Sequence, residues 1–183
     1  MSEKILLRDA THEDASAVTA LHVASWRASY RGVLPDAYLD GEAEAERGAH
    51  WKKTLASLKA DDLVLLAETS EGLCGFISVY RNAEPGYDAY LDNLHVRPGH
   101  RGGGLGRQLL AAALERMIEG GAKTLCLWAF DQNQGAIRFY QRLGGRPVEY
   151  GFDPFAGSNA PHTKIAWNDL PKFLDACSEA AKP

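Results

Sequence analysis

One segment organises the sequence around it: residues 91–107 read LDNLHVRPGHRGGGLGR. Its first part is rich in apolar residues and predicts a β-strand over residues 89–96. Pro98 and the glycines that follow predict a loop over residues 98–104, and helical spacing of apolar residues begins at Leu105. A glycine-rich turn between a strand and a helix gathers backbone N–H groups at the helix N-terminus, where their partial positive charge favours a phosphate or pyrophosphate. The segment therefore predicts an anion-binding loop.

Two common phosphate-binding fingerprints do not fit this loop. In the dinucleotide pattern G-x-G-x-x-G, the sixth position counted from Gly102 holds Arg107 instead of glycine. Counted from Gly99, the third position holds Arg101. The P-loop pattern fails as well, because an arginine and a glutamine follow Gly106 where lysine and serine or threonine are required. A generic nucleotide-binding domain is thus disfavoured, and a helix start that is glycine-rich without a ligand stays open as the alternative.

Hydrophobic periodicity on both sides of the segment predicts a mixed α/β domain. Upstream, we expect a strand at residues 5–7, helices at residues 13–30, 36–39 and 42–58, and a hairpin of strands at residues 63–68 and 73–80. Downstream, we expect a helix at residues 105–119, a strand at 124–129, a helix at 134–143, strands at 146–152 and 163–167, and a loop at 151–161 between them. Apolar residues from Leu170 to Cys177 then follow helical spacing. We expect one domain over residues 1–170 and a C-terminal amphipathic helix and tail over 171–183.

Composition limits the possible classes of function. The chain has 183 residues with 20 Lys and Arg against 24 Asp and Glu, giving a net charge of −4, and its hydrophobic content of 45% is that of an ordinary globular protein. Nucleic-acid-binding proteins usually have a basic face, so nucleic acid is not an expected partner.

Cysteine usage and the absence of long apolar runs indicate in which cell compartment we expect the protein to act. Cys74 and Cys126 lie within apolar runs, and with Cys177 they form no pattern with metal-ligand spacing. No metal is expected. The sequence has no run of 18 apolar residues and begins with no signal peptide, so we expect a cytoplasmic protein with no membrane partner.

Three motifs together resemble the GNAT superfamily of N-acetyltransferases. Residues 101–106, RGGGLG, match its pyrophosphate loop R/Q-x-x-G-x-G/A, and residues 133–144, NQGAIRFYQRLG, are similar to its segment N-x-x-A-x-x-F/L-Y-x-x-x-G. Residues 26–35, WRASYRGVLP, resemble the first helix and loop of one bacterial branch. The resemblance implies a central mixed, mostly antiparallel sheet of about six to seven strands flanked by helices. It also implies a β-bulge that separates strand 89–96 from strand 124–129 and opens a V-shaped slot for the cofactor.

The family resemblance further implies an enzyme that transfers an acetyl group from acetyl-CoA to a primary amine of a small molecule or peptide by direct attack. It assigns the pyrophosphate to the glycine loop, and the pantetheine arm to strand 89–96, where the arm would pair like an added strand. The implied cofactor-binding residues are Leu94, His95, Val96, Arg101, Gly102, Gly103, Gly104, Leu105, Gly106, Arg107, Asn133 and Tyr140. Asn133 is also expected to cap the following helix. A non-catalytic CoA-binding regulatory module is the alternative.

Acetyl transfer to an amine needs a proton acceptor for the ammonium and a proton donor for the leaving thiolate. Tyr140 stands at the position of the family's general acid, and a core aromatic residue is its structural alternative. For the base the sequence offers Asp92, His95 and Glu68, and His95 is equally a packing or surface histidine. Some relatives carry a glutamate on the strand that here holds Trp128, and this chain has no carboxylate there.

The acceptor site is expected at Trp26, Tyr30 and Arg31, with plain helix packing as the alternative for Trp26. Tyr150, Asp153 and Phe155 lie in the late loop, which is expected to close over the acceptor. Specificity in such folds is set by loops, so the sequence does not name the amine. The C-terminal helix and the exposed strand edges make a homodimer a further expectation.

Overall fold

A computed structural model describes residues 4–179 of the chain. In this part of the chain, seven strands form one sheet in the order β1-β2-β3-β4-β5-β7-β6. The β4–β5 pair is parallel and the other neighbouring pairs are antiparallel, which confirms the mixed, mostly antiparallel sheet. The strands are β1 (Leu6–Asp9), β2 (Leu63–Thr69), β3 (Gly72–Arg81), β4 (Ala89–Val96), β5 (Leu125–Phe130), β6 (Arg146–Asp153) and β7 (Ala160–Trp167).

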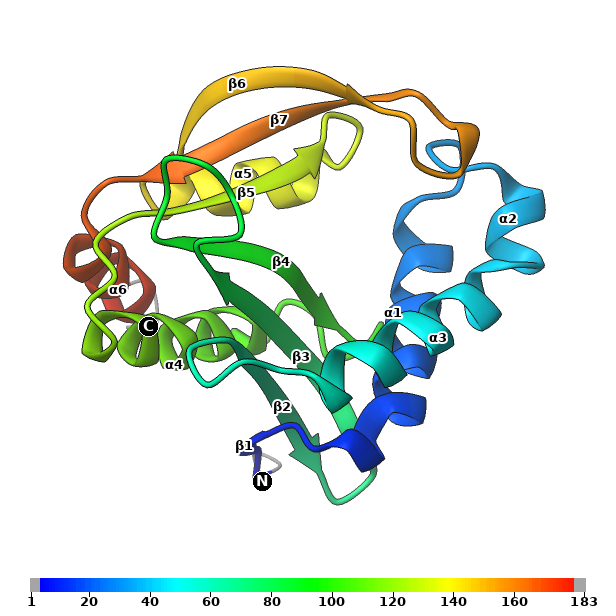
Figure 1. Cartoon of the computed structure of the whole chain (residues 1–183), viewed down its shortest axis with the longest axis horizontal. Helices are drawn as coiled ribbons and strands as arrows, with labels where there is room; N and C mark the ends of the chain where they lie inside the picture. Colours follow the sequence, from blue (N-terminus) through cyan, green and yellow to red (C-terminus); the bar gives the residue numbers. More distant parts are fainter. Residues whose placement is uncertain (1–3, 180–183) are drawn as a thin grey trace.

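The helices cover both faces of the sheet (Figure 1). One group is formed by α1 (Ala15–Ser29), α2 (Asp36–Asp40) and α3 (Ala43–Ala56), and a second by α4 (Leu105–Glu119) and α6 (Leu170–Glu179). The short helix α5 (Gln134–Arg142) follows β5. None of the helices in residues 4–179 is long and apolar enough to cross a membrane.

Strand β2 shows why the middle of the sheet is apolar on both faces. Val64 and Leu66 pack in the cluster that holds α1 and α3, whereas Leu63 and Leu65 pack in the cluster that holds α4 and α6. Because successive side chains of a strand point to opposite faces, a strand covered on both sides reads as a continuous apolar run instead of an alternation. The same coverage buries β3 between the two helix groups.

Most element boundaries match the expectation. Helix α4 and strand β4 have the expected bounds, and the hairpin of β2 and β3 is present. The expected helix 13–30 is divided into a 3-10 turn, His12–Asp14, and α1. Ion pairing accounts for that turn, because the Asp14 carboxylate accepts two hydrogen bonds from Arg8 and one from the Thr11 backbone N–H.

The expected loop over residues 151–161 is wrong at its two ends, which belong to strands, and holds for residues 154–159 between them. Strand β6 continues to Asp153 and β7 begins at Ala160, leaving a short connection that contains the 3-10 turn Phe155–Gly157. The pairs Phe152–Pro161 and Gly151–His162 extend the hairpin, and the Asp131 N–H donates to the Pro161 carbonyl. Pairing between distant strands overrides the local turn signals of the glycine and proline residues here.

The C-terminal helix α6 docks on the body of the protein, as its apolar spacing predicts. Leu170, Phe173 and Cys177 are buried in the cluster that contains α4, and the Phe173 ring stacks on Trp167 with centroids 4.1 Å apart. Cys74, Cys126 and Cys177 are buried free thiols. Residues 180–183 of the expected tail lie outside the described residues.

The sheet divides at β4. Its register with β5 covers two pairs, Ala89–Leu125 and Tyr90–Cys126, and beyond them the two strands diverge (Figure 1). On the other side, Ser78 of β3 pairs with Asn93 whereas Val79 pairs with Leu91, so Asp92 is the extra residue of a β-bulge. The structure thus contains the bulge and the divergence that the family resemblance implies.

Candidate functional site

A cleft of about 680 Å³ lies where β4 runs into the glycine loop and α4 begins. The loop reaches α4 through Gly104, the N-cap residue, whose φ of +85° is a conformation that glycine adopts without strain. The unpaired N–H groups of the first turn of α4 lie at this end of the cleft. The expected cofactor-binding residues that line it are Leu94, His95, Val96, Arg101, Gly102, Gly104, Leu105, Gly106, Arg107, Asn133 and Tyr140. Gly103 is exposed in the same loop and is absent from this lining.

Arg101 fixes the glycine loop to α1. Its Nη2 donates to Ser25 Oγ at 3.1 Å and to Ser29 Oγ at 3.2 Å, and its Nε donates to the Val96 carbonyl at 3.2 Å. Two serines one helical turn apart on α1 therefore hold the first residue of the loop motif against the end of β4. The guanidinium is a structural link between the loop and the first helix.

Tyr140 and Asn133 lie together on the opposite wall of the cleft. The Asn133 side chain accepts a hydrogen bond from the Ala136 N–H at 3.2 Å, which confirms the expected helix cap. Tyr140 is 7% exposed, and burial raises its pKa above the ordinary value for tyrosine, with the neighbouring Tyr30 adding to the effect. Burial likewise raises the pKa of Tyr30, and a hydrogen bond with Asn133 opposes that shift.

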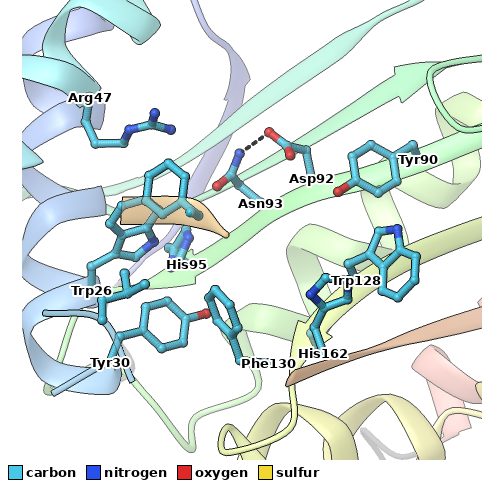
Figure 2. Close-up of a pocket in the computed structure, with 13 residues that line it drawn as sticks. Trp26, Tyr30, Arg47, Tyr90, Asp92, Asn93, His95, Trp128, Phe130 and His162 are labelled. Carbon is cyan, nitrogen blue, oxygen red and sulfur yellow. Dashed lines mark hydrogen bonds between the residues drawn. The ribbon is translucent and has the colours of Figure 1, made fainter. Parts of the chain in front are cut away.

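A second, smaller cavity of about 220 Å³ shares Tyr30 and His95 with the cleft. Figure 2 shows its two side walls, with Trp26 and Tyr30 of α1 on one side and Trp128 and His162 on the other. Its lining consists of Trp26, Tyr30, Leu34, Arg47, Tyr90, Asp92, Asn93, His95, Trp128, Ala129, Phe130, Phe155 and His162. The larger cleft and the smaller cavity thus meet at β4, next to the bulge.

His95 is held between the two cavities by a defined hydrogen-bond chain. Its Nδ1 lies 2.8 Å from Ser25 Oγ, which already accepts from Arg101. A serine hydroxyl has one donor and two acceptor sites, so Ser25 can accept from Arg101 and still hydrogen-bond to Nδ1 in either tautomer of the ring. Burial lowers the pKa of His95 to about 3, and the positive charge of Arg101 adds to the effect. His95 is therefore neutral at pH 7.

Asp92 has a different environment on the same strand. The bulge directs its carboxylate toward the smaller cavity, where Oδ2 accepts a hydrogen bond from Asn93 Nδ2 at 2.6 Å (Figure 2). Asn93 Nδ2 also donates to Ser78 Oγ at 3.0 Å, so the amide is held on both sides. The surrounding protein raises the pKa of Asp92, while the charge of Arg47 and the hydrogen bond from Asn93 oppose that shift.

Several expected residues are not brought to the cavities. Arg31 is paired with Asp36 and Asp40 at 3.2 and 2.5 Å and is absent from both linings. Glu68 accepts two hydrogen bonds from Arg8 at the far side of the sheet, which removes it from the reacting groups. Phe155 lines the smaller cavity, whereas Tyr150 is 73% exposed on β6. The side chain of Asp153 lies outside the described part of the chain.

The structure adds residues that the sequence did not single out. Arg47 reaches the smaller cavity from α3, and Phe130 and His162 reach it from β5 and β7. Ser25 and Ser29 are the partners of Arg101. The two serines follow His22 with helical spacing along one face of α1, and this polar stripe inside an otherwise apolar helix was a detectable signal.

Comparison with known proteins agrees with this arrangement. Residues 17–145 match the model of the acetyltransferase (GNAT) family. An uncharacterized N-acetyltransferase of Bacillus subtilis is 30% identical over 169 residues, which cover 91% of this chain and 94% of the relative.

Solved structures show the same fold. The PaiA N-acetyltransferase of Thermoplasma acidophilum, in complex with coenzyme A, superposes with a TM-score of 0.70 at 22% identity, covering 90% of this chain and 99% of that chain. YncA of Salmonella typhimurium, described as an acetyltransferase with its cofactor acetyl-CoA, has a TM-score of 0.63 at 20% identity, covering 90% of this chain and 93% of that chain.

Proposed function

Because the chain belongs to the GNAT family of acetyltransferases, we propose that it transfers an acetyl group from acetyl-CoA to a primary amine by direct attack in a ternary complex. One observation carries the proposal: a long cleft with a helix N-terminus at one end meets a small cavity that holds a carboxylate. The junction of the two lies at Tyr30 and His95, beside the free edge of β4.

The larger cleft offers groups that suit the charge and the backbone-like amides of acetyl-CoA. Backbone N–H groups from residues 102–107 supply donors for the pyrophosphate, and the α4 macrodipole favours its negative charge. The edge of β4 beyond Tyr90 is not paired with β5, so backbone groups of Leu94, His95 and Val96 are placed to bind the pantetheine arm. Bound there, acetyl-CoA supplies an activated thioester carbonyl at the junction of the cavities.

We propose that Tyr140 protonates the leaving thiolate. The neutral acceptor nitrogen bonds to the carbonyl carbon, the carbon–sulfur bond breaks, and the sulfur takes the proton of the Tyr140 hydroxyl. The proton that the nitrogen loses as the amide forms then restores the Tyr140 hydroxyl through solvent. Tyr140 lines the larger cleft, which supports this role. Burial raises its pKa, so the hydroxyl is protonated over the working pH range and is a weaker acid than an exposed tyrosine. Tyr30 is adjacent and also stays protonated, since burial raises its pKa.

We assign proton removal from the acceptor ammonium to Asp92 in preference to His95. His95 is a weak base because its pKa is lowered to about 3, and a hydrogen bond with Ser25 occupies its Nδ1. Desolvation by the surrounding protein raises the pKa of Asp92, which makes its carboxylate the stronger base of the two. It faces the smaller cavity, where an ammonium would lie.

The test combines binding with turnover. Acetyl-CoA is titrated into the protein by calorimetry, with ATP and NAD as controls, and thiol release is followed with a panel of primary amines. We expect micromolar binding of acetyl-CoA alone. In the Tyr140→Phe variant, we expect kcat to fall by about 100-fold or more with acetyl-CoA affinity unchanged. Unchanged kcat in the variant would exclude Tyr140 as the acid, and acetyl-CoA binding without turnover of any amine would favour the non-catalytic module.

We also propose that the chain forms one domain over residues 1–170 with a C-terminal tail and acts in the cytoplasm. Three buried free thiols are compatible with a reducing compartment. Neither cavity contributes to a metal cluster among the described residues, where no group of three or more His, Cys, Asp or Glu residues is placed to hold a metal ion. The proposed reaction assigns no step to a metal.

A further inference from the structure

The smaller cavity carries two opposite charges on separate walls. Asp92 projects from the bulge of β4, and Arg47 projects from α3 at another edge of the cavity (Figure 2). No ion pair joins them among the described residues: Arg47 is paired with Glu46, and the hydrogen bond to Asp92 comes from Asn93. A cavity that keeps a cation and an anion apart is suited to a ligand that bears both charges.

Arg47 is held in place by packing. Its guanidinium carbon lies 5.2 Å from the centroid of the Trp26 ring and 5.6 Å from that of Phe155. Nη2 donates to Glu46 Oε1 at 2.6 Å, and the side chain is only 14% exposed. Cation–π contacts and a single anchoring carboxylate fix the plane of the guanidinium at the cavity wall.

The hydrogen-bonding capacity of Arg47 is incompletely used. A guanidinium has five N–H donors, and Nε is buried without a hydrogen-bond partner in the described part of the chain. Glu46 is shared, because its Oε2 also accepts a hydrogen bond from the Tyr38 hydroxyl at 2.6 Å. A buried cation with unused donors favours a further anion, and a carboxylate matches the planar geometry of a guanidinium.

Asp92 offers the complementary end. One carboxylate oxygen accepts from Asn93, and the carboxylate borders the smaller cavity. An ammonium group placed here would neutralise a carboxylate that the surrounding protein partly shields from water. It would also lie on the side of the cavity formed by β4, the strand along which the cleft runs.

Between the two charges the cavity is small and largely aromatic. Its volume of about 220 Å³ is below the roughly 300–1,000 Å³ of pockets that hold drug-sized ligands, so a whole antibiotic or a long polyamine would not be enclosed. The aromatic rings that line it belong to Trp26, Tyr30, Tyr90, Trp128, Phe130 and Phe155. These walls favour an apolar or aromatic body.

We propose that the acceptor is a small amino acid-like zwitterion whose amine lies at Asp92, whose carboxylate lies at Arg47, and whose apolar body fills the aromatic cavity. This assignment rests on the proposed acetyl transfer and names the substrate class for it. Arg47 is then a specificity-determining residue that acts on acceptor binding.

The test uses two pairs of amines that differ by one carboxylate: L-phenylalanine with phenethylamine, and 4-(aminomethyl)benzoate with benzylamine. We expect the wild-type protein to favour the carboxylate member of at least one pair by about tenfold or more in kcat/KM, a preference worth about 1.4 kcal/mol. In Arg47→Met, which keeps an apolar stem against Trp26, we expect the preference to fall to about twofold or less. Arg31→Met removes an arginine outside the cavity and is the matched control that keeps the preference.

A second measurement keeps this inference separate from the proposed function. Each amine is titrated into the protein saturated with CoA, and binding is followed by the fluorescence of Trp26 and Trp128, which line the cavity. Tighter binding of the carboxylate member in wild type, lost in Arg47→Met, supports the zwitterion even without turnover. Equal affinity within both pairs, no binding of any of the four amines, or an unchanged preference in a folded Arg47→Met variant overturns it. Failure to bind acetyl-CoA, or selective amine binding without thiol release, overturns the proposed function instead.

Discussion

The neutral, half-buried His95 leads to a quantitative prediction about how stability depends on pH. In the unfolded chain this histidine takes up a proton near its ordinary pKa of 6.5, whereas in the folded protein burial lowers its pKa to about 3. The unfolded state therefore binds more protons between these two values. The corresponding stability is complete above pH 6.5 and is lost progressively as the pH falls toward 3.

The magnitude follows from the width of that interval. Lowering the pH from about 8 to about 5 crosses roughly 1.5 pH units below the ordinary pKa, at about 1.4 kcal/mol for each unit, so His95 alone costs about 2 kcal/mol. His22 acts in the same direction, because burial lowers its pKa well below 6.5. Between these two pH values the free energy of unfolding of the wild-type protein is thus expected to fall by more than the contribution of His95 alone.

The perturbation that isolates His95 is His95→Gln, in which the side-chain amide can still hydrogen-bond to Ser25 as donor or acceptor. Urea unfolding is followed by tryptophan fluorescence at both pH values, and the free energy of unfolding is extrapolated to water. We expect the loss of stability between pH 8 and pH 5 to be about 2 kcal/mol smaller in the variant than in wild type. Comparing the two pH values within each protein cancels any general effect of the substitution. Equal losses in the two proteins would refute the argument that burial keeps His95 neutral.

Two further substitutions test the cofactor loop and the core. In Gly104→Asp a carboxylate faces the proposed pyrophosphate. The matched control is Gly104→Asn, which carries the same backbone strain at φ +85° without the charge. We expect the acetyl-CoA affinity of Gly104→Asp, measured by calorimetry, to be at least about tenfold lower than that of the control, and equal affinities would show that the pyrophosphate does not bind at this loop. In Trp51→Phe the fully buried indole is shortened and His22 Nδ1 loses the donor that lies 2.9 Å away. We expect unfolding in urea to show a loss of about 2 kcal/mol or more, and a loss under about 0.5 kcal/mol would contradict the assigned hydrogen bond.

The sequence was most informative where structure depends on local conformation. The helix start after Gly104 and the cap at Asn133 follow from backbone chemistry within a few residues, and both are present in the structure. The apolar run over residues 63–68 likewise predicts a strand, which is β2 in the structure. These features set the order of the elements and the location of the cofactor cleft.

The smaller cavity, our proposed acceptor site, depends on contacts between distant elements and was only partly predictable. The bulge at Asp92 follows from the pairing of β4 with β3, which no local pattern reveals. Arg47 is one of several charged residues on α3, and its packing against Trp26 of α1 is what distinguishes it as a residue of the cavity. Arg31 shows the opposite error, because the nearby acidic side chains of α2 hold its guanidinium away from the site.

The bulge links cofactor binding to acceptor binding through the geometry of a single strand. Parallel strands cannot be joined by a tight turn, so β4 and β5 are connected through α4, and the N-terminus of that helix lies at the end of β4. Pairing of β4 with β5 stops at Tyr90, just before the bulged Asp92, which leaves the strand edge free for the pantetheine arm. The same residue presents its carboxylate to the smaller cavity. In the proposed reaction, one irregularity in the ladder would bring the thioester and the acceptor amine to the same few residues of β4, and this proximity would be the main contribution of the fold.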